Sequence, residues 1–197
     1  MLKKSLFILL GIISMSTALA NEAIFAMGCF WCGESEFRDH QNSQKMLPGI
    51  IAIEVGYEGG ENPNATYENH AGAKEAVKIT FDPARISYDT LLNIFWHNID
   101  PFDEKGQFCD KGFAYTSAIF YSNQTQKIVA ENSKRLLEAA LHRPIVTDIQ
   151  PAGLFVAAEE YHQNYKFKNP IRYNFYRWNC GRDQRLKELW GEKAHAN

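Results

Sequence analysis

The chain has 197 residues, of which 45% are hydrophobic and 22% are charged. Its 21 Lys and Arg residues are nearly balanced by 23 Asp and Glu residues, so the formal net charge is −2. This length is sufficient for one domain with a substantial hydrophobic core. The lack of a basic excess argues against nucleic-acid binding, because proteins that bind phosphates do so with clustered Lys and Arg.

The first twenty residues have the pattern of a secretory signal peptide. Two lysines precede an apolar run over residues 6–13, and the small residues Ala18 and Ala20 are typical of a cleavage site. The apolar run is too short to span a bilayer by itself. We therefore expect residues 1–20 to be cleaved, with retention as a membrane anchor as the alternative. Residues 21–197 are predicted to form a single domain that works in the periplasm or outside the cell.

A predicted strand-to-helix junction carries the first chemically distinctive residue, Cys29. Residues 23–27 form an apolar run typical of a buried strand, Gly28 permits a sharp turn, and residues 32–39 contain few helix breakers. Free N–H groups and the positive end of a helix dipole favour a thiolate at this position. We therefore expect Cys29 to have a lowered pKa and to act as a nucleophile. The alternative interpretation is a small buried hydrophobic residue.

The rest of the chain alternates between predicted strands and helices. The further expected strands are residues 49–55, 75–81, 115–121 and 145–149. The further expected helices are residues 87–99, 123–141, 157–166 and 182–190. The order strand, helix, strand, strand, helix, strand is the split β-α-β pattern of ferredoxin-like folds. It predicts an α+β two-layer sandwich with a mixed sheet and a C-terminal extension.

The C-terminal extension, residues 168–197, is aromatic and basic. Between residues 166 and 193 the sequence contains eight Lys and Arg residues against three acids. A run of this kind is normally a solvated face or a tail folded over the domain. We expect a tail that packs on the domain and contains one short helix.

Four cysteines follow the predicted signal peptide: Cys29, Cys32, Cys109 and Cys180. In an exported protein they can form two structural disulfides. The Cys-x-x-Cys spacing of Cys29 and Cys32 is more typical of a redox pair. A mixed zinc site of Cys32, Cys109 and Cys180 is a further alternative, but the single Cys-x-x-Cys lacks the second pair of a zinc ribbon. We expect no metal.

Residues 28–31, Gly-Cys-Phe-Trp, resemble the active site of the peptide-methionine sulfoxide reductases, in the form that acts on the S epimer. Further stretches resemble the same family and, with this motif, cover most of the chain after residue 20. They are Gly56-Tyr57-Glu58-Gly59-Gly60 with Thr66-Tyr67, Glu75-Ala76-Val77, Ile86-Ser87-Tyr88 through Asp100-Pro101, and Asp110, Tyr115 and Tyr161-His162-Gln163. The chain is identified as a member of this family.

The chain departs from the family pattern at three places. Ala73 stands where the family usually has a His, two residues before its catalytic Glu. Residues 113–116 read Phe-Ala-Tyr-Thr in place of the commoner Thr-Gln-Tyr-Arg, and Cys32 stands where most members have Gly. These differences concern loop geometry and thiol recycling rather than the reaction.

The resemblance implies the catalytic roles. Cys29 attacks the sulfoxide sulfur, and Glu75, with its pKa raised in an apolar pocket, is the general acid. Tyr67 and Tyr115 donate hydrogen bonds to the sulfoxide oxygen. Taken alone, the two tyrosines would be half-buried packing residues and Glu75 a solvated residue at the start of a strand.

The resemblance also implies the substrate contacts. Phe30 and Trp31 hold the terminal methyl of the substrate, because a methyl group offers only apolar contact. Asp110 and His162 orient the site. Taken alone, His162 would be a surface histidine.

Turnover requires a second thiol, which condenses the sulfenic acid on Cys29 into a disulfide, and an external thioredoxin-like dithiol, which reduces it. Cys180 resembles the mobile C-terminal cysteine of the family and is expected to be the first resolver. Cys32 is the close alternative or a relay, and Cys109 is a third possibility. We expect no cofactor, peptide or protein methionine sulfoxide as substrate, and a monomer.

Two other classes of protein stay open on the residues alone. A general thiol–disulfide oxidoreductase would use Cys29 and Cys32 as a thioredoxin-type pair, but Glu75 would have no function in it. A non-catalytic binding protein would use its cysteines as structural disulfides. A thiol–disulfide oxidoreductase would reduce insulin disulfides, whereas a sulfoxide reductase would reduce methionine sulfoxide, so a comparison of the two activities distinguishes them. In a binding protein, the structural disulfides should resist mild reduction.

Overall fold

The structure is a computed structural model that describes residues 21–38 and 45–194. The predicted signal peptide lies outside the described residues, so its cleavage stays a prediction. Among the described residues, 21–38 and 45–194, no helix combines the length and the apolar character needed to cross a membrane.

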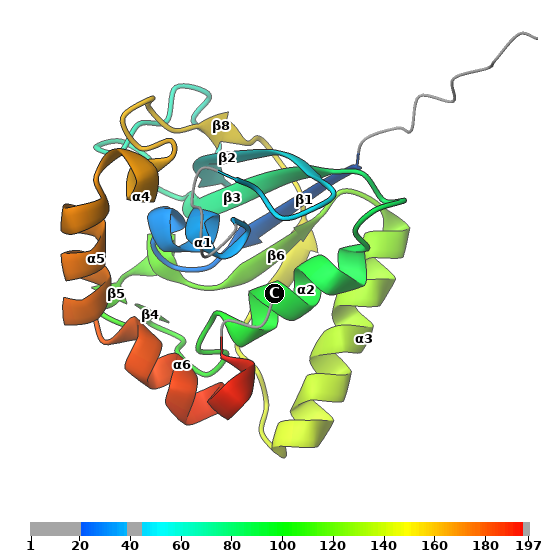
Figure 1. Cartoon of the computed structure of the whole chain (residues 1–197). Coiled ribbons are helices and arrows are strands. Elements are labelled where there is room, and N and C mark those ends of the chain that lie inside the picture. Colours follow the sequence, from blue (N-terminus) through cyan, green and yellow to red (C-terminus); the bar gives the residue numbers. More distant parts are fainter. Residues whose placement is uncertain (1–20, 39–44, 195–197) are drawn as a thin grey trace, which may run out of the picture.

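One six-stranded sheet forms the centre of the molecule (Figure 1). Across the sheet, the strands are β7 (Asp148–Pro151), β6 (Ala118–Tyr121), β1 (Asn21–Ala26), β3 (Lys74–Phe81), β2 (Ile50–Glu58) and β8 (Val156–Ala157). Neighbours are antiparallel except β6 and β7, which are parallel. The predicted α+β class with a mixed sheet is confirmed, and the finer ferredoxin-like label stays a prediction.

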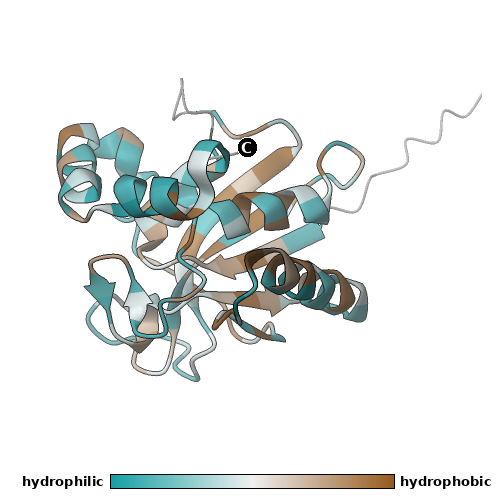
Figure 2. Cartoon of the chain, turned by 90° about the horizontal axis from the view of Figure 1, so that it is seen from below, coloured by the Kyte–Doolittle hydropathy of each residue, from teal (hydrophilic) through white to brown (hydrophobic). Residues whose placement is uncertain are grey.

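Helices cover one face of this sheet. They are α1 (Phe30–Glu36), α2 (Tyr88–His97) and α3 (Gln124–Leu141). Three further helices follow beside α1: α4 (Tyr165–Lys168) packs on α1, α5 (Pro170–Asn179) on α4, and α6 (Arg182–Trp190) on α5. Two 3₁₀ turns are η1 (Phe113–Tyr115) and η2 (Gly191–Lys193). Successive residues of β1 point to opposite faces. Phe25 stacks on Phe37 and Phe95 at 5.9 and 5.1 Å under the helices, whereas Ile24 packs near Phe155 on the other face. Figure 2 shows the hydrophobic residues gathered along the strands.

The C-terminal part differs most from the prediction. Residues 157–166 are not a helix, since β8 ends at Ala157 and the chain turns until α4 begins at Tyr165. The expected tail contains a whole additional helix, α5, which Pro170 begins. Helix α5 buries Tyr173, whereas Phe175 and Trp178 are exposed.

The loop between α2 and β6 is also more ordered than expected. It contains a hairpin of β4 (Gly106–Gln107) and β5 (Asp110–Lys111), which leaves Phe108 and Cys109 at the turn. Tyr115, expected in a strand, ends the 3₁₀ turn η1 instead. Gly112 before it has a φ of +119°, a backbone conformation that ends the extended run of β5.

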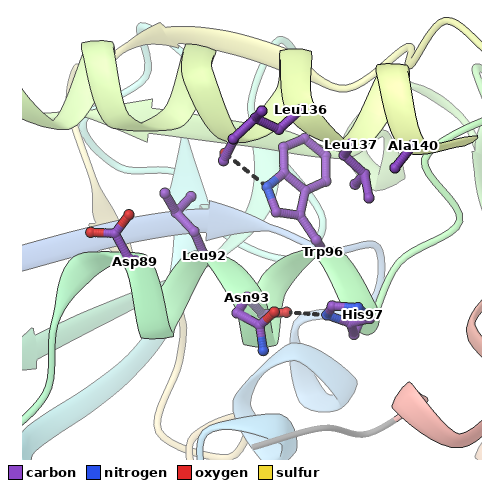
Figure 3. Close-up of a pocket in the computed structure, with 9 residues that line it drawn as sticks. Asp89, Leu92, Asn93, Trp96, His97, Leu136, Leu137 and Ala140 are labelled. Carbon is purple, nitrogen blue, oxygen red and sulfur yellow. Dashed lines mark hydrogen bonds between the residues drawn. The ribbon is translucent and has the colours of Figure 1, made fainter.

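A hollow lies between α2 and α3 (Figure 3). Its lining residues are Asp89, Leu92, Asn93, Trp96, His97, Ser133, Leu136, Leu137 and Ala140. Trp96 Nε1 donates a hydrogen bond to Ser133 Oγ at 3.0 Å across it. None of the four cysteines lines this hollow, so it is not the site that the sequence predicts.

Candidate active site

Cys29 lies between the end of β1 and the start of α1, as the sequence predicts. Gly28 has a φ of +79°, and a Cβ there would lie 2.5 Å from Gln107 Cβ, so this position requires glycine. The Cys29 carbonyl accepts hydrogen bonds from the N–H groups of Cys32 and Gly33 at 3.0 and 3.1 Å, which begin the helix. The Cys29 side chain is 6% exposed.

A small cavity opens at Cys29. Its lining residues are Cys29, Phe30, Trp31, Tyr67, Glu75, Asp110, Tyr115 and Tyr176. All of them except Tyr176 are candidates from the sequence, and they come from five separate segments of the chain. Tyr176 was missed because its only sequence signal is its place in an aromatic run on α5. His162, the remaining candidate for substrate contact, does not line the cavity.

Glu75 is the buried acid of the cavity. Its side chain accepts a hydrogen bond from the Phe30 N–H at 2.9 Å, and the residue is 2% exposed. Burial raises the pKa of the Glu75 carboxyl to about 8, and the nearby charge of Asp110 adds to this. Glu75 is therefore protonated at neutral pH and has a proton to give.

Tyr67 and Tyr115 are hydrogen-bond donors in the same cavity, and their side chains also bond to each other. Burial, followed by the charge of Glu75, raises the pKa of both phenols, so both keep their protons. The loop with Tyr67 is held by Glu159, whose carboxylate accepts from the Tyr67 N–H at 3.1 Å and from the Tyr57 hydroxyl at 3.0 Å. Sequence reasoning missed Glu159.

Trp31 is fixed by a frame of other rings. Its indole stacks on Tyr165 with centroids 3.6 Å apart, and Tyr176 meets it edge-on at 6.0 Å. Trp31 Nε1 donates to His162 Nδ1 at 3.0 Å. His162 is 2% exposed, and burial lowers the pKa of its imidazole, so the neutral ring accepts this bond. His162 therefore acts on the site through Trp31.

Cys29 and Cys32 are both free thiols, buried and hydrogen-bonded to each other. Burial raises the pKa of the Cys29 thiol, whereas the hydrogen bond from Cys29 lowers the pKa of Cys32 to about 6. Arg182 and Arg177 also favour the Cys32 thiolate. The expected lowering of the Cys29 pKa is therefore wrong, because burial, followed by the hydrogen bond and charge of Cys32, outweighs the helix terminus.

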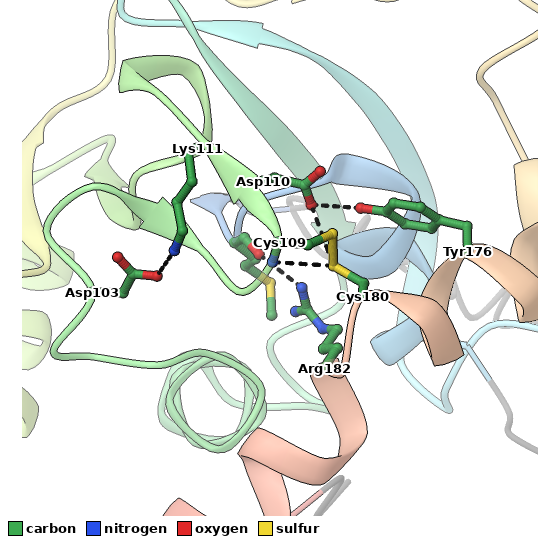
Figure 4. Close-up of a disulfide and its surroundings, with 8 residues drawn as sticks. Asp103, Cys109, Asp110, Lys111, Tyr176, Cys180 and Arg182 are labelled. Carbon is green, nitrogen blue, oxygen red and sulfur yellow. Dashed lines mark hydrogen bonds and ion pairs between the residues drawn. A yellow bond between two sulfur atoms is a disulfide. The ribbon is translucent and has the colours of Figure 1, made fainter.

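The other two cysteines, Cys109 and Cys180, form a disulfide with a Cα–Cα distance of 5.0 Å (Figure 4). In this state Cys180 is bonded to Cys109 and is not a free thiol, so its role as the first resolver of Cys29 stays a prediction. The segment around it is also anchored. Arg182, 1% exposed, donates to the carbonyl oxygens of Met27 and Asn98 at 3.2 and 2.6 Å.

The same disulfide bears on the zinc alternative. Ligand atoms of Cys109, Cys180 and Asp110 all lie within 4.8 Å of one another. The two sulfurs are joined to each other, however, and Cys32 lies with Cys29 instead. The alternative zinc set of Cys32, Cys109 and Cys180 is therefore not assembled.

Comparison with known proteins decides the family. The family model of peptide methionine sulfoxide reductase matches residues 21–194. The chain is 47% identical over 176 residues to peptide methionine sulfoxide reductase MsrA 2 of Rhizobium meliloti, covering 88% of this chain and 85% of that protein. It is 48% identical over 177 residues to MsrA of Bacillus subtilis, covering 87% and 96%.

The chain belongs to the peptide methionine sulfoxide reductase family. It is thus an oxidoreductase that acts on sulfur groups, a peptide-methionine (S)-S-oxide reductase, as the resemblance implied. Solved structures agree with this assignment. Reduced Mxr1 of Saccharomyces cerevisiae has a TM-score of 0.69 at 28% identity, covering 77% of this chain and 87% of that one. Methionine sulfoxide reductase A of Corynebacterium diphtheriae has a TM-score of 0.65 at 29% identity, covering 77% and 76%.

Lys74 contacts the turn that contains one of the departures from the family pattern, residues 113–116. Its side chain is 2% exposed, and its Nζ donates to Thr116 Oγ1 and lies 4.1 Å from the Phe113 ring centroid. Thr116 and Phe113 flank η1, the turn that presents Tyr115. The buried Lys74 side chain therefore holds this turn.

Proposed function

We propose that this reductase converts the S epimer of methionine sulfoxide, in peptides and proteins and as the free amino acid, to methionine. The observation that carries the proposal is that Cys29 and a protonated Glu75 share one cavity with two neutral tyrosines. The sulfoxide needs a nucleophile at sulfur and a proton at oxygen, and this cavity supplies both. Phe30 and the fixed Trp31 provide the apolar wall for the methyl group.

The first step transfers the oxygen from the substrate to Cys29. Cys29 passes its proton to the Cys32 thiolate and attacks the sulfoxide sulfur, while Glu75 protonates the oxygen. Hydrogen bonds from Tyr67 and Tyr115 stabilise the charge that develops on this oxygen. The oxygen becomes the hydroxyl of a Cys29 sulfenic acid, and the substrate leaves as methionine. Cys29 is oxidised by two electrons and the substrate sulfur is reduced by two.

Cys32 is the best-placed resolver. The Cys32 sulfur attacks the sulfur of the Cys29 sulfenic acid, and the S–S bond forms as the S–O bond breaks. The hydroxyl leaves as water after it takes up the proton of the Cys32 thiol, which Glu75 passes on. The two side chains are already hydrogen-bonded in the free enzyme. Cys180, by contrast, would first have to leave Cys109 and break the anchoring contacts of α6. This proposal replaces Cys180 with Cys32 as the first resolver.

An external dithiol protein of thioredoxin type then reduces the Cys29–Cys32 disulfide by thiol–disulfide exchange. One structural relative, Mxr1, has been solved in complex with Trx2. The cycle uses protein side chains and this reductant, and no cofactor. We further propose that the enzyme is an exported monomer that repairs oxidised proteins in the periplasm or outside the cell, because residues 1–20 have the pattern of a signal peptide.

A single turnover without reductant tests this proposal. The protein, with Cys109–Cys180 intact, is mixed with a stoichiometric amount of the S or R epimer of a methionine sulfoxide peptide. We expect about one methionine per enzyme from the S epimer only, and peptide mass spectrometry should find a new Cys29–Cys32 disulfide. The Cys29→Ser variant is the control and should form none. A new disulfide between Cys29 and Cys180 would instead assign the resolving role to Cys180, and turnover by Cys29→Ser would refute the nucleophile.

A further inference from the structure

The Cys109–Cys180 disulfide takes no part in the steps above, yet it adjoins the cavity. Cys109 immediately precedes Asp110, and Cys180 follows Tyr176 by one helical turn. Asp110 and Tyr176 both line the cavity beside Cys29. The disulfide therefore joins the two segments that supply one wall of the substrate site.

Three contacts link the β4–β5 turn to the end of α5 (Figure 4). The first is the S–S bond itself. The second is the hydrogen bond from the Cys109 N–H to Cys180 Sγ at 3.2 Å. The third is the hydrogen bond from the Tyr176 hydroxyl to Asp110 Oδ2 at 2.5 Å. Tyr176 also meets the Trp31 indole edge-on, so the linked wall reaches the residue that holds the substrate methyl.

We propose that the Cys109–Cys180 disulfide is a positioning element of the substrate site, which fixes the Asp110 carboxyl and the Tyr176 ring relative to Cys29. The proposal rests on the proposed function, which places the methionine sulfoxide side chain against this wall. It makes Cys109 and Cys180 positioning residues rather than redox participants. Substrate affinity, rather than the chemical step, depends on them.

The surrounding anchors explain why the effect is local. The base of the hairpin is held by Gln107, which exchanges two hydrogen bonds of 2.8 Å with the backbone of Asp100. The helical side is held by Arg182. Arg182 also reaches the turn, since its guanidinium carbon lies 4.5 Å from the Phe108 ring centroid, but the next residue, Cys109, is exposed, and a two-stranded hairpin is marginal by itself. Loss of the disulfide therefore loosens Cys109 and the adjoining Asp110, while Gln107 and Arg182 keep the rest of the hairpin in place.

The double variant Cys109→Ala/Cys180→Ala tests the proposal without leaving an unpaired thiol. In single turnovers with the S epimer, we expect the half-saturating peptide concentration to rise roughly tenfold and the saturating rate to change less than about threefold. The Cys29–Cys32 disulfide should still form. If the Ala pair does not fold, as judged by circular dichroism, the Cys109→Ser/Cys180→Ser pair replaces it.

A double-mutant cycle with Tyr176→Phe separates positioning from general stabilisation. If the disulfide acts through the bond between Tyr176 and Asp110, its removal in the Tyr176→Phe background should raise the half-saturating concentration by less than about threefold. Equal effects in both backgrounds, or an unchanged affinity in the double variant, would overturn the proposal. Intact affinity with lost multiple turnover would show a redox relay instead. Failure of the proposed function is recognised separately, because the wild-type protein would then form no methionine from the S epimer.

Discussion

Glu75 is the general acid of the proposed mechanism. Glu75→Gln keeps the size of the side chain and removes the proton that the sulfoxide oxygen requires. We expect the single-turnover rate to fall by ~10²–10⁴, the usual contribution of a general acid, while peptide binding is retained. Rapid-quench assays of methionine formation measure the rate. Glu54→Gln, a change in a surface acid of β2, is the matched control and should behave as wild type.

The pH profile of the single turnover should be bell-shaped. Glu75 acts in its protonated form, so the rate falls as the pH rises through its pKa of about 8. Cys32 accepts the Cys29 proton as a thiolate, so the rate also falls as the pH drops through its pKa of about 6. Glu75→Gln should lose the alkaline limb and Cys32→Ser the acidic limb. A flat wild-type profile between pH 5 and pH 9 would contradict both assignments.

Lys74 is expected to act on catalysis through Tyr115. Lys74→Met removes the ammonium that bonds Thr116 and covers the Phe113 ring, so η1 is no longer held. We expect roughly a tenfold lower saturating rate, because Tyr115 then misplaces its hydroxyl. In a Tyr115→Phe background, Lys74→Met should lower the saturating rate little further. Lys78→Met, on the same strand, controls for the loss of a charge; equal effects of the two substitutions would contradict the positioning role.

At the scale of elements, the turn between β1 and α1 should be among the least tolerant of substitution. Gly28→Ala combines a φ of +79° with a Cβ 2.5 Å from Gln107 Cβ, whereas Gly72→Ala has a φ of +84° and meets nothing within 4 Å. Both substitutions cause backbone strain, but only Gly28→Ala also causes steric overlap, so the difference between them measures the cost of the overlap. We expect Gly72→Ala to cost about 1 kcal/mol of unfolding free energy and Gly28→Ala about 2–4 kcal/mol in urea titrations. Equal losses would show that Gln107 moves aside at no cost.

Prediction from sequence succeeded where a local pattern fixes the element. Residues 75–81, predicted as a strand, form most of β3, and residues 87–99, predicted as a helix, contain α2, which Ser87 caps by accepting from the Thr90 N–H at 3.1 Å. It failed where tertiary contacts decide. Residues 157–166 have helical composition, but Gln163 uses its side chain to bond the backbone of Val55, so this segment lies against β2 as a turn.

The candidate site shows the same division. Its residues were found by motif, and the strand-to-helix turn at Cys29 follows from the local sequence. Spacing does not determine which cysteines meet, since Cys109 and Cys180 are separated by 71 positions. Burial likewise depends on the assembled cavity, so the raised pKa of the Cys29 thiol had no local signal.

At the scale of the whole molecule, the predicted export signal ends where the folded domain begins. Asn21 is already the first residue of β1 and pairs with Phe81. Cleavage after Ala20 would therefore leave every pair of this strand in place. We expect protein expressed from the full sequence in a bacterial host to appear in the periplasm with an N-terminus at about Asn21, as measured by intact mass. Intact mass that includes residues 1–20 in the membrane fraction would indicate an anchor.

The contact of Arg182 with the carbonyl of Met27 joins one of the last helices to the residue just before the nucleophile's turn, 155 positions earlier. Chains are made from the N-terminus, so Cys29 is synthesised long before the guanidinium that adjoins it. A chain that stops before α6 lacks both this contact and the charge that favours the Cys32 thiolate. The Cys32 thiolate therefore gains the favourable charge of Arg182 only when almost the entire polypeptide exists.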